Sequence, residues 1–267
     1  MAILTLDGAI AGMQYPRWVV KAGTGTLVAG RPFSLFYLAG IPGAAVAPTP
    51  GISGAALTTY LGQIPFTNPV SGSTYLARFT GMATIAGKLI LCDRLWHNSG
   101  ISVTTTTAQT VNSVAFPARD VAASTNGNGV FIGLEITGLT GAGSATPTIS
   151  YTDQSGNASN TGSMINTYSA SSPTGSFYPF SLAAGDTGVR SIQTVTLGIS
   201  MTSGSISLVA YRILAELEVP GSNVSFAIDA LTSGFPTLYD NSVPFIIFVP
   251  STTTSTSISG SVVFTQG

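Results

Sequence analysis

Apolar and polar residues alternate along much of the middle of the chain, with the period of two that is typical of β-strands. Residues 88–96 predict a strand with period-two faces, one holding Leu89, Leu91, Asp93 and Leu95 and the other Ile90, Cys92, Arg94 and Trp96. Residues 130–136, 148–151 and 177–182 predict further short strands. Clean alternation favours antiparallel sheets that are buried on one face. The pattern therefore predicts a β-sandwich core over residues 80–220.

The clearest local signal is a pair of alternating segments, residues 189–201 and 205–219, joined by a short loop that ends in Gly204. A three-residue loop with glycine in the left-handed position is a common hairpin closure. In that register the apolar rows of the two segments face each other, and Arg190 lies opposite Glu216. We therefore predict a cross-strand ion pair, Arg190–Glu216, worth ~0.2–1 kcal/mol.

The N-terminal part of the chain has a different amino-acid composition. Residues 1–79 are rich in Gly, Pro and Ala, which predicts an extended, loop-rich arm or layer. Ser53 is a candidate cap for one short helix over residues 54–61. The apolar residues of this region must be buried on the main domain or on a neighbouring chain.

Residues 221–267 form a third segment, with a possible short helix at 225–232 and strand-like stretches at 244–250 and 257–265. Residues 241–267 contain no charged residue. An uncharged β-prone edge aggregates when it is left open, so these strands should be paired in their own sheet or with a neighbour.

Many short strands separated by turn signals, without βαβ alternation or a fixed-period repeat, indicate an all-β fold. The expected fold is an antiparallel β-sandwich of the jelly-roll type. It carries an extended loop-rich N-terminal arm and one or two short helices. The expected segments are the arm, 1–79, the sandwich core, 80–220, and the C-terminal segment, 221–267.

Charge is scarce in this chain. Nine basic and ten acidic residues make up 7% of the 267 residues, against ~25% in an ordinary soluble domain. The net charge of −1 argues against a nucleic-acid partner, and 44% hydrophobic residues argue against intrinsic disorder. Residues 32–77 are uncharged, but their prolines and glycines argue against a membrane-spanning helix. A weakly charged surface suits a chain that works against partners in an assembly.

Candidate catalytic residues are few. His97 is the only histidine, and Asp93 and Ser99 lie near it in the sequence. On a strand Asp93 and His97 would be ~13 Å apart, which is too far for a hydrogen bond. The single Cys92 sits in an apolar run and is expected to be a small buried residue.

Other kinds of site are equally poorly supported. Glu216 and Glu218 share a strand face at roughly the spacing of a glycosidase pair, but a solvated strand end explains them as well. One histidine and one cysteine do not make a zinc site. The glycine-rich stretches at 23–30 and 127–133 lack the lysine and the helix of a phosphate-binding loop. We therefore expect no enzyme activity, no metal and no cofactor.

Several stretches resemble virion structural proteins of tailed bacteriophages. Near the N-terminus these are TLDGAIAGMQYPRW (5–18) and GRPFSLFYLAGIPGA (30–44). Further along the chain these are LILCDRLWHNSGISVTTTTAQTVNS (89–113), AGDTGVRSIQTVTL (184–197) and LVAYRILAELE (208–218). Together these five stretches comprise 79 of the 267 residues, about 30% of the chain, and they carry no catalytic motif.

The resemblance implies a capsid decoration or cement protein that clamps neighbouring major capsid subunits. Such proteins are commonly β-rich, often jelly rolls and often homotrimers. It also implies a place on the capsid exterior after synthesis in the host bacterial cytoplasm. The charge and the Pro/Gly content independently predict no nucleic-acid and no membrane partner. The resemblance supplies no functional residue.

The residues themselves suggest where partners would bind. Trp18, Phe33, Phe36 and Tyr37 are large apolar side chains spaced among Gly and Pro in the N-terminal region, and they are the interface candidates. Three alternatives stay open: a receptor- or glycan-binding component of a tail or fibre, a neck or tail-tube component, and a hydrolase that uses His97.

Overall fold

The computed structural model describes residue 3 and residues 5–267, and antiparallel strands dominate that part of the chain. The helices are short: α1 covers Leu6–Ala11 and α2 covers Ala230–Ser233, with a single 3-10 turn, η1, at Leu35–Tyr37. The predicted all-β antiparallel fold with short helices is confirmed.

The chain forms two compact units, each assembled from segments that are far apart in the sequence. Unit 1 comprises residues 1–45, 58–93 and 213–267, and unit 2 comprises residues 46–57 and 94–212. The expected division at residues 79 and 220 is corrected by this arrangement, because the N-terminal and C-terminal segments share one unit. Two long strands, β6 and β13, contribute residues to both units.

Unit 1 is a sandwich of two layers. One layer has the strand order β14-β5-β17-β1-β3, with β15 also paired to β5, and the other has the order β13-β6-β16-β2. The strands are β1 (Arg17–Lys21), β2 (Phe33–Ser34), β3 (Gly40–Ile41), β5 (Thr74–Ala83), β6 (Gly87–His97), β13 (Ser205–Val219), β14 (Phe226–Asp229), β15 (Thr237–Leu238), β16 (Pro244–Pro250) and β17 (Ile258–Gln266). Side chains from both layers, such as Phe79, Leu89 and Phe264, form one buried cluster.

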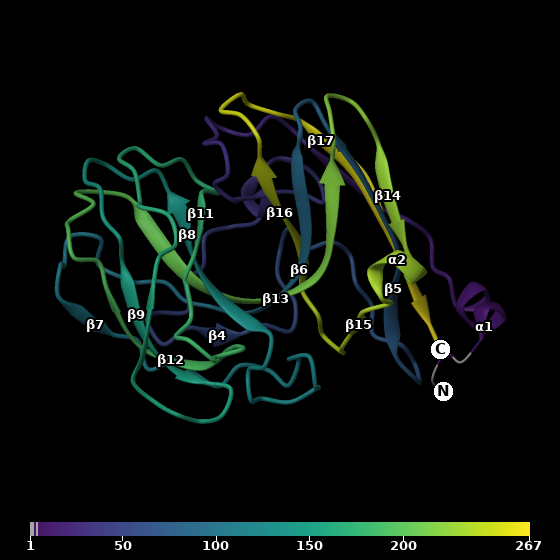
Figure 1. Cartoon of the computed structure of the whole chain (residues 1–267), viewed down its shortest axis with the longest axis horizontal. Helices are drawn as coiled ribbons and strands as arrows, with labels where there is room; N and C mark the ends of the chain where they lie inside the picture. Colours follow the sequence, from purple (N-terminus) through teal and green to yellow (C-terminus); the bar gives the residue numbers. More distant parts are fainter. Residues whose placement is uncertain (1–2, 4) are drawn as a thin grey trace. The chain divides into compact units, whose positions relative to one another are not determined.

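The first layer of unit 1 contains strands from both the N-terminal and the C-terminal part of the chain, β1 and β17. β17 lies between β5 and β1 and pairs with both, and Figure 1 shows β17 beside β5. The uncharged C-terminal strand is therefore paired within its own sheet, as expected. The N-terminal region, expected as an extended arm or layer, contributes β1 to this layer. β3 can approach β1 because Gly40 has no Cβ, which would overlap the carbonyl oxygen of Val20.

Unit 2 has its own two layers and its own core. One layer has the order β10-β9-β12-β7, and the other has the order β11-β8-β13-β6, with β4 paired to β6. The additional strands are β4 (Ala55–Ala56), β7 (Ala108–Thr110), β8 (Val130–Gly138), β9 (Thr148–Asp153), β10 (Asn160–Ser163), β11 (Phe177–Pro179) and β12 (Val189–Thr196). Apolar side chains from both layers, including Ile132, Tyr151 and Val195, form its buried cluster.

The predicted hairpin between residues 189–201 and 205–219 is wrong. Both segments are strands, but β12 pairs with β9 and β7, whereas β13 pairs with β8. Gly204 has the expected positive φ of 99°. An apolar row specifies which face of a strand is buried, but it does not specify the neighbouring strand. Here the row that holds Val195 and the row that holds Leu208 contribute to the same core from two different layers.

The helix predictions are also corrected. Residues 54–61 contain the short strand β4 instead of a helix. Residues 225–232 divide into β14 and the first residues of α2, which begins where the Asp229 side chain accepts hydrogen bonds from the backbone N–H groups of Leu231 and Thr232.

Candidate functional site

Helix α1 is fastened to unit 1 by its backbone and exposes its apolar side chains. The Thr5 side chain caps the helix by accepting a hydrogen bond from the Gly8 N–H at 3.1 Å. Thr265 Oγ1 donates to the Ala9 carbonyl oxygen at 2.6 Å, which ties the helix to the end of β17. No helix residue is buried, and Leu6 and Ile10, four residues apart on one face, are 75% and 56% exposed.

The segment that leads from α1 into β1 continues this exposure. The Gln14 N–H donates to the Phe264 carbonyl oxygen at 2.8 Å, so the backbone is held against β17. Met13, Tyr15 and Trp18 are nevertheless 52%, 87% and 59% exposed. We call Leu6, Ile10, Met13, Tyr15 and Trp18 together the N-terminal apolar surface.

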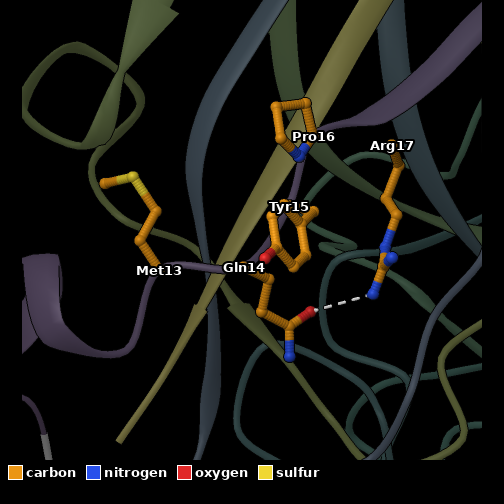
Figure 2. A pocket seen from close by; sticks show the side chains of 5 residues that line it. All are labelled: Met13, Gln14, Tyr15, Pro16 and Arg17. Atoms are coloured by element: carbon orange, nitrogen blue, oxygen red, sulfur yellow. Dashed lines mark hydrogen bonds between the residues drawn. The ribbon is translucent and has the colours of Figure 1, made fainter.

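A hollow of about 620 Å³ lies along residues 13–17. Figure 2 shows the ring of Tyr15 between the side chains of Met13 and Arg17. Arg17 Nη2 donates to Gln14 Oε1 at 3.3 Å, so the guanidinium group is held beside the Gln14 amide (Figure 2). The hollow thus combines an aromatic ring and a thioether with one tethered cation.

The outer face of the first layer of unit 1 extends this surface without charge. Trp18 pairs across the sheet with Ser261, which in turn pairs with Thr80, and the hydroxyl oxygens of Ser261 and Thr80 are 2.9 Å apart. The next row consists of Ile41, Val20, Ser259 and Met82. Neither row has a charged side chain.

An arrangement of this kind is suited to binding another protein surface. The core of a protein interface is depleted in charge and enriched in Tyr, Trp and Met. Monomeric proteins rarely expose large contiguous apolar patches unless the patch has a partner. The chemistry available here is therefore docking through aromatic and aliphatic side chains.

The four predicted interface residues differ in their exposure to solvent. Trp18 lies in the N-terminal apolar surface, and Tyr37 is half-buried. Phe33 and Phe36 are each 1% exposed, so their assignment as partner contacts is corrected. They are buried within unit 1, where Phe36 packs against Phe245 with ring centroids 5.7 Å apart.

The predicted ion pair Arg190–Glu216 is wrong because the two residues lie on strands that do not pair. Arg190 belongs to β12 in unit 2, whereas Glu216 belongs to the part of β13 in unit 1. Glu216 Oε2 instead accepts from Lys88 Nζ at 2.9 Å, and Glu218 Oε1 lies 3.1 Å from the same nitrogen. Hydrogen bonds to Glu216 and then to Glu218 raise the pKa of Lys88.

The side chains considered for catalysis take separate partners. Asp93 accepts hydrogen bonds from Ser242 Oγ at 3.0 Å and from the Val243 N–H at 2.7 Å. Ser99 Oγ accepts from the Gly51 N–H at 2.9 Å. His97 Nδ1 accepts from Arg94 Nε at 3.3 Å.

Burial, and then the positive charge of Arg94, lower the pKa of His97 to about 3, which makes His97 a weak base. Cys92 is buried, as predicted. Over residue 3 and residues 5–267, no group of three or more His, Cys, Asp or Glu side chains is placed to hold a metal ion. Within the same residues, no helix has the length and the apolar character needed to cross a membrane.

Sequence reasoning missed four of the five residues of the N-terminal apolar surface. The exposure of Leu6 and Ile10 could have been predicted. Their spacing of four residues places both on one apolar face of a short helix, and a short helix buries little of that face. The exposure of Met13 and Tyr15 has no comparable signal. It depends on how residues 13–15 lie along β17, where Met13 bridges to Thr265 and the Gln14 N–H donates to the Phe264 carbonyl oxygen.

The comparisons with known proteins assign no family. No protein-family model matches the chain, and no curated protein matches it. The crystal structure of the infectious bursal disease virus VP2 subviral particle shares 10% sequence identity with this chain, covering 96% of this chain and 81% of that one, with a TM-score of 0.21. The structure of the infectious bursal disease virus Gt strain shares 12% identity, covering 95% and 42%, with a TM-score of 0.13. Likeness at this level supports neither a fold nor a function for this chain.

Proposed function

We propose that this chain is a non-enzymatic structural component of a tailed-phage particle, a head decoration or cement protein that binds neighbouring major capsid subunits. The observation that carries the proposal is the N-terminal apolar surface on a chain with only 7% charged residues. The sequence resemblance of residues 5–18 and 30–44 to phage virion proteins supports it. Residues 5–18 include all five residues of this surface.

The size of the N-terminal apolar surface is adequate for docking. A fully exposed aromatic side chain offers ~150–250 Å² and aliphatic side chains somewhat less. Given the five exposed fractions, the surface amounts to roughly 600 Å², against ~800 Å² per partner in a standard interface. The neighbouring uncharged rows on β1 and β17 extend this area. Tyr15 and Trp18 are the residue types that most often dominate binding energy.

A cement protein also benefits from repetition. On a capsid lattice many copies of one modest contact act together, and linkage between subunits multiplies their effect. We propose that the chain is a homotrimer on the capsid exterior, where each subunit presents its N-terminal apolar surface to a major capsid protein. The low charge of the chain suits this role because little charge has to be desolvated on docking.

The test is reconstitution on particles that lack this chain. Purified protein is added to such particles, and bound protein is measured by co-sedimentation over a range of concentrations. We expect the double variant Tyr15→Ala/Trp18→Ala to bind at least ~30-fold more weakly, because an interface hot spot contributes ~2 kcal/mol or more.

The matched control is Leu231→Ala, which removes a 90% exposed side chain of α2 outside this surface and should leave binding unchanged. Wild-type occupancy by the double variant would refute docking through Tyr15 and Trp18. Sedimentation equilibrium of the free protein tests the trimer, and a monomer at all concentrations would refute it.

A further inference from the structure

A second hollow in unit 1 has a different chemistry from the N-terminal apolar surface. Its volume is about 370 Å³, and it is lined by residues of 58–68 together with Asn241 and Ser242. The lining side chains are hydroxyls, carboxamides and the ring of Phe66, and none of them is charged. The volume lies within the range of ~300–1,000 Å³ that small-molecule sites occupy.

Hydrogen bonds orient the carboxamides at this hollow. Gln63 Oε1 accepts from the Tyr60 N–H at 2.6 Å. Asn241 Oδ1 accepts from Asn68 Nδ2 at 2.9 Å, and Asn68 Oδ1 accepts from the Asn241 N–H at 2.7 Å. Because backbone donors fix Gln63 and Asn68, the position of each oxygen and nitrogen is settled.

This arrangement leaves two NH2 groups for a ligand. With their oxygens engaged, Gln63 and Asn241 direct their donors, Nε2 and Nδ2, to no acceptor within the described residues. Each NH2 group has two N–H donors. The exposed hydroxyl groups of Thr58 and Thr59 can donate or accept beside them.

Phe66 supplies an apolar wall. Its ring meets Phe264 edge-on, with centroids 5.7 Å apart and an interplanar angle of 85°. This contact holds the ring in place, and Phe66 stays half-buried, so part of the ring is accessible to a ligand in the hollow. The site therefore pairs a fixed aromatic surface with fixed neutral donors.

We propose that this hollow binds a neutral saccharide. Sugar hydroxyl oxygens would accept from Gln63 Nε2 and Asn241 Nδ2, and an apolar C–H face of the sugar would pack on Phe66. The lack of a lining cation disfavours phosphorylated or sialylated ligands, whose charge would stay unpaired. This activity goes beyond capsid docking and uses other residues.

The experiment is a screen of the full-length protein on an array of neutral and sialylated oligosaccharides and of peptides, followed by titration of the best neutral glycan. Gln63→Glu and Asn241→Asp keep the oxygens that accept from Tyr60 and Asn68, but they replace each NH2 donor by an acceptor. We expect each variant to bind at least ~10-fold more weakly, in line with the loss of one hydrogen bond.

Asn126→Asp makes the same change of charge in an exposed loop of unit 2 and should bind like wild type. Thermal unfolding of each variant checks that the fold is kept. Four results would overturn the proposal: no neutral glycan bound by wild type, a preference for sialylated glycans, a preference for peptides, or unchanged binding by both hollow variants. The particle-binding assay is separate, and Gln63→Glu is expected to dock on capsids normally.

Discussion

Lys21 gives a sharp prediction because it is buried and, among residue 3 and residues 5–267, has no carboxylate partner. It is 3% exposed, and its Nζ donates to the carbonyl oxygens of Leu38 at 3.1 Å and Pro42 at 2.7 Å. Burial lowers the pKa of Lys21 from 10.5 to about 8. The folded state therefore releases this proton at a lower pH than the unfolded state does.

The sign and size follow from proton linkage. Between pH 8 and pH 10 the unfolded chain holds more protons at this site, so the free energy of unfolding rises with pH. At ~1.4 kcal/mol per pH unit, the contribution of Lys21 is roughly 2–3 kcal/mol over that range. The pKa of Lys88 is raised by its carboxylate partners, so its contribution to the free energy of unfolding is lost only above pH 10.5, the pKa of a lysine in the unfolded chain.

The assay is urea unfolding of wild type and Lys21→Met at a series of pH values from 7 to 10. Methionine keeps the apolar stem and removes the titrating group. We expect the stability difference between wild type and variant to move by 2–3 kcal/mol in favour of wild type as the pH rises. Parallel curves for the two proteins over this range would refute the reasoning.

Two further predictions concern polar groups of unit 2. Arg94 Nη2 and Glu135 Oε2 form an ion pair at 2.7 Å with both side chains fully buried, so Glu135→Gln should cost ~3–5 kcal/mol in urea unfolding. The control Glu216→Gln, in an exposed pair with Lys88, should cost less than ~1 kcal/mol, and equal losses would contradict this. Burial, and then the hydrogen bond to Asp186, raise the pKa of Tyr151 to about 12. Ultraviolet titration should show that Tyr151→Phe removes a phenol that ionises near that pH, and loss of one that ionises near pH 10 would contradict this.

The local strand pattern of this chain was predictable, but its partners were not. β13 and β16 cover the ranges expected for them, because the alternation of β13 and the short apolar run of β16 are local signals. The pairing of β12 with β9 depends on which apolar rows share a core. The division into two units has the same cause, since β6 and β13 look like ordinary long strands in the sequence.

The candidate sites were predictable to a smaller degree. Trp18 was predicted from its large aromatic side chain alone. Phe33 and Phe36 are also large aromatic residues, but they are buried because β2 and η1 are part of unit 1. Gln63 and Asn241 meet at one hollow only through the fold, since their segments are far apart in the chain. Residue type identifies side chains capable of binding, and topology decides which of them face solvent.

We propose that this chain binds the major capsid protein as part of the virion. The most direct measurement is the copy number and position of the chain on intact particles, by cryo-electron microscopy together with quantitative gel analysis. The proposal predicts density on the outer face of the head, at a fixed ratio to the major capsid protein, with residues 6–18 at the contact. Absence from the particle, or confinement to the neck or the tail, would contradict it.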